Sequence, residues 1–322
     1  MRTHLTEAWH LKVPIIGAPM SPQAGPDLAC AISRAGGLGM LGVAFAQPAA
    51  RLLEEAAACS EQGVRFGIGL MSWAAAQRPE LLDAAIRAQP FLIALSFGDI
   101  SAQAARVRGA GIELAAQVQD LRSALAAEEA GATLLVAQGT EAGGHTGAVG
   151  TLPLLQEVLE AVRVPVVAAG GVGTGRGLAA VLAAGAAGAW IGTRFLVAEE
   201  ARNTERARQR VMTAGASDTV LTSVFDAVQS IPWPPQYLGR ALRNSFTDAW
   251  HGKEAELGAD EAAKARFGAA RQKDDYDTAH IYAGQAVGLA NRLQPAAAIV
   301  AELARGAEER LAALCAAQSA SG

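Results

Sequence analysis

A histidine flanked by glycines is the residue of this chain best placed to do chemistry. His145 lies in the stretch Ala137-Gln-Gly-Thr-Glu-Ala-Gly-Gly-His-Thr-Gly147, which follows an apolar run. An imidazole, with an ordinary pKa of about 6.5, accepts a carbon-bound proton or donates to a developing oxyanion. An ordinary loop histidine is the alternative, and the glycines at a strand end favour the catalytic interpretation. We expect the nearby Glu141 to bind a backbone amide.

Two glycine clusters further along the chain predict a site for a phosphate group. The stretch 164–195 reads VPVVAAGGVGTGRGLAAVLAAGAAGAWIGTRF, with each cluster after a short apolar run. Glycines allow backbone N–H groups to approach an anion without interference from Cβ atoms. We expect the first loop and the Gly192-Thr193 turn to form a cradle with two loops.

These loops need a framework that gathers strand ends, and the apolar pattern predicts one. Eight short apolar runs alternate with Ala-rich helical stretches over about 200 residues, which favours a (β/α)8 barrel, also called a TIM barrel, over an open sheet. Small residues followed by glycine end several helices, as expected of glycine C-caps. The expected strands are 13–18, 38–41, 65–70, 91–95, 112–117, 133–137, 164–169 and 189–191.

The composition changes after Phe195 and predicts a lid. Residues 202–210 are charged and helical, Ile231-Pro-Trp-Pro-Pro235 is a rigid turn, and residues 250–277 are densely charged. Such segments do not continue a barrel. We therefore expect a barrel over 1–198, a mostly helical lid or insertion over 199–282, and a C-terminal segment, 283–322, whose helix returns to the barrel.

Composition bounds the class of protein. The 322 residues are 51% hydrophobic and 18% charged, and the net charge of −4 offers no basic field for nucleic acid or an anionic membrane. We expect a cytoplasmic protein without a signal peptide or membrane span. Cys30, Cys59 and Cys315 are far apart in sequence, so we expect neither disulfides nor a metal site.

Two further strand ends carry candidate residues. The first expected strand ends in Gly17-Ala-Pro-Met-Ser21, where Met20 either supplies a polarizable surface for a ring system or packs in the core. The fifth ends at Gln117, an amide suited to a pyrimidine-like edge or simply a solvated residue at a helix start.

Taken together, these motifs resemble the nitronate monooxygenases, formerly called 2-nitropropane dioxygenases. The resemblance spans nearly the whole chain and rests on GAPM (17–20), AGGLGML (35–41), QGTEAGGHTG (138–147), AAGGVGTGRG (168–177), GTRF (192–195), GRALRNSFTDAW (239–250) and YAGQAVGL (282–289). It implies a TIM barrel with a helical lid and noncovalently bound FMN.

The resemblance also implies roles by position. His145 matches the catalytic histidine of the family. The residues implied in FMN binding are Ala18, Pro19 and Met20 under the ring, Gly69, Gln117 and Gln138 at polar edges, Ala142 and Gly143 beside the ring, and Ala169, Gly170, Gly171, Gly173, Gly192 and Thr193 around the phosphate.

Two positions depart from the family pattern. Gly69 stands where many members have Asn, and Gln117 stands where many have Lys. A positive charge near the pyrimidine of the flavin stabilises its reduced form, so its absence makes reduction harder unless another group substitutes. These departures concern the substrate more than the cofactor.

The implied reaction is oxidation by O2 of alkyl nitronates, or of nitroalkanes first deprotonated by His145, to carbonyl compounds and nitrite. Aromatic lid residues such as Trp233, Tyr237 and Phe246 could close the pocket or simply pack within the lid. An NAD(P)H-dependent FMN reductase acting on an enoyl thioester or quinone is the alternative within redox chemistry. A barrel that binds a phosphorylated ligand without redox chemistry is the alternative of another class. The sequence leaves open whether the protein forms a homo-oligomer.

Overall fold

The computed structural model describes residues 1–319, and its centre is a parallel sheet of eight strands in the order β1-β9-β8-β6-β5-β4-β3-β2. All eight strands lie where the apolar runs predict them, with small shifts at their ends. The strands are β1 (Ile15–Gly17), β2 (Gly39–Gly42), β3 (Phe66–Met71), β4 (Leu92–Ser96), β5 (Glu113–Val118), β6 (Leu134–Gln138), β8 (Val166–Ala169) and β9 (Gly188–Ile191).

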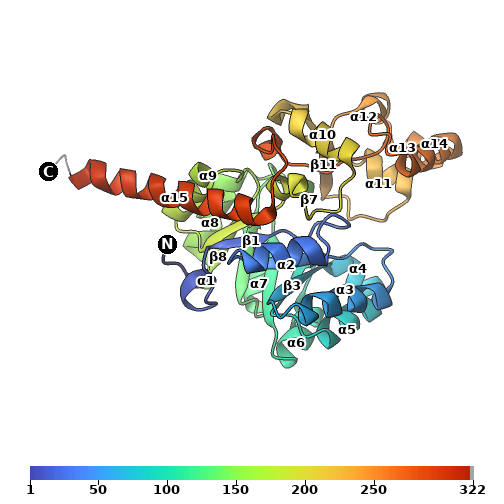
Figure 1. Ribbon diagram of the computed structural model, residues 1–322. Coiled ribbons are helices and arrows are strands. Elements are labelled where there is room, and N and C mark those ends of the chain that lie inside the picture. Colours follow the sequence, from blue (N-terminus) through green and yellow to red (C-terminus); the bar gives the residue numbers. More distant parts are fainter. Residues whose placement is uncertain (320–322) are drawn as a thin grey trace.

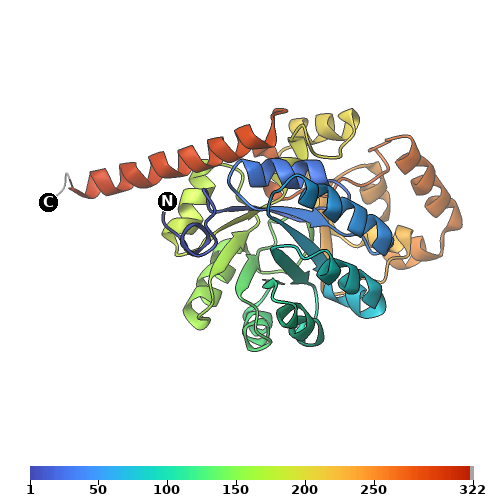
Figure 2. The same ribbon diagram turned by 60° about the horizontal axis from the view of Figure 1, so that its bottom comes forward.

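Backbone hydrogen bonds close this sheet into a barrel. The Gly17 amide donates to the Leu38 carbonyl at 2.9 Å, and the Leu38 amide donates to the Ile15 carbonyl at 3.0 Å, joining β1 to the start of β2. Figure 2 shows the strands gathered at the centre with helices around them. The predicted TIM barrel is therefore confirmed.

Alternation along the strands fills both sides of the barrel wall. In β1 the side chain of Ile15 belongs to the core between strands and helices, whereas Ile16 belongs to the core inside the barrel. Val166 and Val167 of β8 divide in the same way. Because successive strand residues face opposite sides, runs that are apolar throughout suit a sheet covered on both faces.

Helices cover the outside of the barrel (Figure 1). The glycine C-caps are present, for example Gly36 at φ 100° and Gly185 at φ 104°, a left-handed conformation that favours glycine. The short helix α4 (Ser72–Gln77) and the N-terminal α1 (His4–Glu7) were not expected from the sequence. The remaining helices of the ring are α2 (Pro26–Arg34), α3 (Ala49–Glu61), α5 (Pro79–Arg87), α6 (Ser101–Gly109), α7 (Leu121–Glu129), α8 (Thr151–Ala161) and α9 (Gly175–Ala183).

The C-terminal helix α15 (Ala296–Ser319) completes the ring. It packs against both α9 and α2, and its distal end extends beyond the barrel, as Figures 1 and 2 show. The close approach to α9 requires glycine, because a Cβ atom on Gly175 would lie 2.5 Å from the carbonyl carbon of Gly306. Helix α15 thus takes the place after β9 that a barrel helix normally occupies.

The segment between β9 and α15 contains short strands as well as helices. Three strands, β10 (Thr219–Thr222), β11 (Leu238–Leu242) and β7 (Gly144–Thr146), form an antiparallel sheet in the order β10-β11-β7. Since β7 lies in the loop after β6, this sheet ties the lid to the barrel. The helices are η1 (Thr193–Val197), α10 (Glu205–Thr213), η2 (Ala216–Asp218), α11 (Val224–Gln229), α12 (Ser245–Trp250), α13 (Glu254–Ala259), α14 (Glu261–Gln272) and η3 (Gln285–Leu289).

The lid has a small core of its own, built around Phe225, Phe246 and Phe267. The division of the chain into a barrel, a lid and a C-terminal segment at residues 198 and 282 stays a proposal. The sheet β10-β11-β7 takes strands from both sides of residue 198 and therefore crosses the first boundary. Nowhere in the described residues is a helix both long and apolar enough to cross a membrane.

Gly175→Ala should destabilise the protein by about 1–3 kcal/mol, because the added methyl group overpacks the contact with α15. Thermal or urea unfolding measures the change. The matched control is Gly268→Ala in α14, where a Cβ atom meets nothing within 4 Å. The control should gain about 0.5–1 kcal/mol from helix propensity. Equal stability of the two variants would contradict the assigned packing of α15.

Candidate active site

His145 lies on a short strand, β7, a structure that its flanking glycines did not predict. Strand β7 pairs with β11 so that His145 stands opposite Gly239, and the imidazole is buried. Gln138 donates from Nε2 to the His145 carbonyl at 3.0 Å, and Gln119 donates to Gln138 Oε1 at 2.9 Å. Gln138, expected at a flavin edge, therefore holds the backbone of His145.

The lid supplies a carboxylate to the imidazole. Nε2 of His145 lies 3.0 Å from Oδ1 and 2.9 Å from Oδ2 of Asp226 in α11, and both side chains are buried. A carboxylate accepts, so Nε2 carries the proton and Nδ1 is left as the basic nitrogen. In the described part of the chain, Nδ1 has no hydrogen-bond partner.

Sequence reasoning missed Asp226, although a signal exists. Val224-Phe-Asp-Ala-Val228 places one carboxylate in an apolar helix. A buried carboxylate needs a partner, so such a residue points to a basic group across the interface. The identity of that group depends on the fold.

Two more ionisable rings pack beside this pair. Burial and the Asp226 carboxylate raise the pKa of the Tyr282 phenol well above its ordinary value, so this side chain stays protonated. His280 packs between Phe267 and Tyr282, and its Nδ1 atom is shielded from solvent without a partner. Burial, with smaller contributions from Arg271 and His145, lowers the pKa of His280 to about 3.

The glycine loop after β8 has the form of an anion cradle. Gly170 and Gly171 have φ values of 102° and 74°, so the chain turns sharply out of the strand. Within residues 1–319, no protein acceptor pairs with the backbone N–H groups of Gly171, Gly173, Gly192 and Thr193. Orphan donors from two neighbouring loops suit a phosphate group.

Main-chain contacts connect this cradle to the segment that carries His145. A Cβ atom on Gly143 would lie 2.6 Å from the Gly284 nitrogen, so the two segments touch through glycine. The Gly284 amide also donates to Thr193 Oγ1 at 2.9 Å. Ala142 donates to the Gly139 carbonyl, and the Gly139 amide in turn donates to Ala169 at 2.9 Å. The loops after β6, β8 and β9 are thus one hydrogen-bonded unit.

The predicted role of Glu141 is confirmed. Its Oε2 accepts from the Thr151 amide at 2.7 Å and from the Thr151 hydroxyl at 2.5 Å. Glu141 therefore organises the turn before α8.

The end of β1 explains the glycine at position 69. Ala18, Pro19 and Met20 are half-buried, and a Cβ atom on Gly69 would lie 2.3 Å from Cγ of Pro19. An asparagine does not fit beside this proline. Met20 Sδ lies 3.3 Å from the position of a Cβ on Gly192 and thereby reaches the cradle. Gln117 is half-buried, and among the described residues its amide has no hydrogen-bond partner.

The aromatic residues of the lid divide into two groups. Trp233 stacks on His145 with ring centroids 3.4 Å apart and planes 8° from parallel. Tyr237 lies near the same place, edge-on to Phe97. Phe246 is buried in the lid core, so the second alternative for this residue, packing within the lid, holds.

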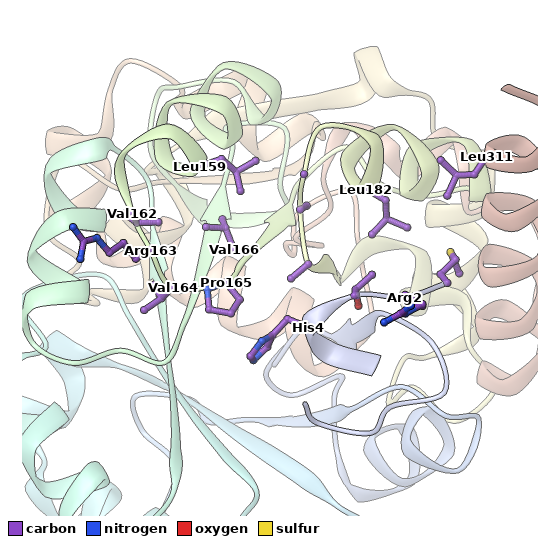
Figure 3. A pocket seen from close by; sticks show the side chains of 15 residues that line it. Arg2, His4, Leu159, Val162, Arg163, Val164, Pro165, Val166, Leu182 and Leu311 are labelled. Carbon is purple, nitrogen blue, oxygen red and sulfur yellow. The ribbon is translucent and has the colours of Figure 1, made fainter. Parts of the chain in front are cut away.

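A hollow of about 610 Å³ lies at the other end of the barrel, where β8 and β9 begin (Figure 3). Its wall includes His4, Arg163 and Leu182. In TIM barrels the chemistry takes place where the strands end, and the opposite face serves stability. This hollow is therefore not the candidate active site.

A closed parallel barrel with a buried imidazole and unpaired backbone donors at its carboxyl end has the arrangement of a TIM-barrel enzyme. The family model described as nitronate monooxygenase matches residues 76–306. A nitronate monooxygenase of Paraburkholderia phytofirmans is 32% identical, and the alignment covers 91% of each chain. An octahydro-indene-carboxyl-CoA dehydrogenase of Rhodococcus jostii is 34% identical over 76% of this chain and 68% of that one.

A solved structure agrees with this match. The nitroalkane oxidase of Streptomyces ansochromogenes superposes with a TM-score of 0.83, at 30% identity over 97% of this chain and 100% of that one. The chain belongs to the nitronate monooxygenase family. Members of this family are flavin-dependent oxidoreductases, and this protein is therefore an enzyme of that class.

His280 should make the lid sensitive to acid. The native ring stays neutral until the pH approaches 3, whereas the unfolded chain takes up a proton below about 6.5, so the free energy of unfolding falls as the pH drops through this window. In His280→Phe, the loss of stability between pH 7 and pH 5 should shrink by up to about 2 kcal/mol.

Urea unfolding at the two pH values measures this difference. His4→Phe is the control, because His4 is exposed and lies far from the lid. An unchanged pH dependence in His280→Phe would show that other groups govern acid stability.

Proposed function

We propose that this protein uses FMN to oxidise alkyl nitronates, and nitroalkanes after deprotonation by His145, with O2 as the second substrate and carbonyl compounds and nitrite as products. The buried pair of His145 and Asp226, one strand away from an anion cradle, carries the proposal. Family membership and the nitroalkane oxidase likeness support the reaction class.

The residues present fit FMN. The backbone N–H groups of Gly171, Gly173, Gly192 and Thr193 would receive the phosphate, since none of them has a protein acceptor among residues 1–319. Ala18, Pro19 and Met20 would contact the ring system, and Gln117 offers an unpaired amide to a polar edge. When bound, FMN supplies the electron transfer between the nitronate and oxygen.

His145 acts as the base at a defined atom. With Nε2 engaged by Asp226, Nδ1 has its lone pair free to accept the proton from the carbon that bears the nitro group. The resulting imidazolium is stabilised because the Asp226 carboxylate is buried beside it. A preformed nitronate does not need this step.

Asp226 is a positioning residue that acts through the imidazole. It fixes the tautomer and the orientation of the ring, as the carboxylate of a serine-protease triad does for its histidine. Tyr282 remains protonated beside Asp226 and therefore adds no second negative charge to the site. The lid therefore supplies the carboxylate of Asp226, and the segment after β6 supplies the basic imidazole of His145.

His145→Asn should reduce kcat/KM for neutral nitroethane by about 10²- to 10⁴-fold, the range expected for loss of a general base. Turnover of preformed ethylnitronate should fall much less. Asp226→Asn should show the same selectivity with a smaller loss, because the base remains but is less well oriented. Nitrite release measures both rates.

The control for charge removal in the lid is Asp248→Asn, since Asp248 pairs with Arg243 on the surface. Equal losses on both substrates would refute the role of His145 as base. Rapid bleaching of the flavin by NADH without oxygen, together with no nitrite from ethylnitronate, would support the reductase alternative.

Purified protein should be yellow and release FMN on denaturation, and Gly171→Asp should be colourless. The new carboxylate would lie among the donors expected to bind the phosphate and repel it. Gly111→Asp is the control, because Gly111 is also a left-handed glycine with nothing within 4 Å of a Cβ atom. A colourless wild type would favour the barrel without redox chemistry. Full FMN content in Gly171→Asp would place the phosphate elsewhere.

A further inference from the structure

Five aromatic side chains from separate parts of the chain form a connected set of ring contacts, in which Trp233 and Phe97 touch His145. Phe45 follows β2, Trp73 lies in α4, Phe97 follows β4, and Trp233 and Tyr237 lie between α11 and β11. We call these five residues the aromatic cage. Four segments distant in sequence thus place rings at the carboxyl end of the barrel, where substrates of this fold bind.

The rings of the cage contact one another edge-on or tilted. Ring centroids are 5.0 Å apart for Phe45 and Trp73, 5.1 Å for Trp73 and Trp233, and 5.2 Å for Phe97 and Tyr237. Phe97 also meets Trp233 at 5.1 Å with planes 78° apart. Rings packed edge-on in this way can surround another flat ring and contact its faces and edges.

Trp233 is the flat ring at the centre. Its indole lies parallel to the imidazole of His145 at 3.4 Å, the contact thickness of two π-systems. A group that approaches the face of the imidazole must therefore displace this indole, and a flat ring would recover the same contacts with His145, Phe97 and Trp73.

Two features of the barrel side of the cage are costly unless they serve a ligand. Phe97 has a φ of 63°, a left-handed conformation that is strained for a bulky residue. The Trp73 indole nitrogen is buried and has no partner in the described part of the protein. An unpaired buried donor destabilises a fold, so this N–H suits an acceptor that arrives with a substrate.

The segment that carries Trp233 is attached so that it can move. We call residues 231–237 the strap. Among described residues, its backbone hydrogen bonds run from Ile231 to Asp226, from Trp233 to Ile231 and from Tyr237 to Pro234, and none reaches the barrel. Pro232, Pro234 and Pro235 stiffen it, and Ser230, at φ 52°, marks its start. Among the described residues, ring contacts of Trp233 with Trp73 and Phe97 join the strap to the barrel without main-chain hydrogen bonds.

We propose that the aromatic cage selects nitronates that carry an aryl group. The aryl ring takes the place of the Trp233 indole against His145, and the strap shifts outward so that Trp233 becomes the outer wall of the site. The Trp73 N–H donates to an oxygen of the substrate. This inference rests on the proposed function for its reaction and on the cage for its specificity.

The first experiment compares kcat/KM of the wild-type holoenzyme for the nitronates of 1-nitro-2-phenylethane and nitroethane. Burial of the phenyl ring in an apolar pocket should favour the aryl substrate by about 10- to 100-fold. Trp233→Leu should reduce this preference several-fold, whereas Trp73→Phe, which keeps a ring and removes the N–H, should lower kcat/KM for both nitronates, because both carry the oxygen that accepts from it. Trp250→Leu is the matched control, since Trp250 packs in the lid outside the cage, and it should keep the wild-type preference.

The second experiment measures binding without turnover. Carboxylates share the planar, anionic shape of nitronates, so 3-phenylpropionate should bind the holoenzyme about 10-fold or more tightly than propionate, as followed by tryptophan fluorescence. Equal affinities together with equal kcat/KM values would overturn the aryl specificity. No turnover of any nitronate, with tight binding of 3-phenylpropionate retained, would reject the proposed function and leave the cage as an aryl site. A preference that is unchanged in Trp233→Leu would show that the aryl ring binds elsewhere, and unchanged kcat/KM values in Trp73→Phe would contradict the assigned hydrogen bond.

Discussion

The contact between His145 and Asp226 fixes how the lid sits on the barrel. The Nε2–H of His145 is the donor to a carboxylate that is buried with it, and a buried acceptor left without its donor destabilises a fold by about 1–3 kcal/mol or more. The two residues are 81 positions apart in sequence, one on β7 and one on α11. Pairing of β7 with β11 adds main-chain hydrogen bonds beside them. The body of the lid is therefore a permanent part of the active site, which does not assemble if the lid swings away.

The anion cradle follows from a different constraint, which is local. Backbone N–H groups can point at a phosphate only where no side chain intervenes and the chain turns out of its strand, so glycines at φ 102° and 74° come directly after β8. The same reasoning explains Gly69. Pro19 occupies the space of a side chain at this position, so the proline and the glycine form a matched pair and the loss of the family asparagine is steric. Gln117, on β5, is neutral where the family resemblance has a lysine in many members, so this position carries no positive charge.

The sequence predicts well those features that depend only on residues close together in the chain. Apolar alternation sets β1 and β8, and glycine after a small residue sets the helix ends at Gly36 and Gly185, so the barrel and the cradle follow from short windows. Strand β7 could not be predicted in this way, because three residues of Gly-His-Thr become a strand only when β11, almost a hundred residues later, pairs with them. Asp226 and Trp233 reach His145 through the same long-range pairing. Residue types alone therefore indicated the base but not the groups that orient and cover it.

The way in which the lid is joined determines how a substrate can enter. Strands β7 and β11 and the Gly143–Gly284 contact join lid and barrel through main chain, where displacement breaks several hydrogen bonds at once. The strap between α11 and β11 lacks such bonds to the barrel, and ring contacts slide and exchange at lower cost than paired backbone groups do. Opening therefore concentrates at Trp233, the one ring stacked on the base. Because the strap begins only a few residues after Asp226, it can move while the carboxylate stays paired with His145. The ring that covers His145 and the carboxylate that pairs with it are thus carried by separate parts of a short stretch of chain, so the strap can shift without exposing the buried Asp226.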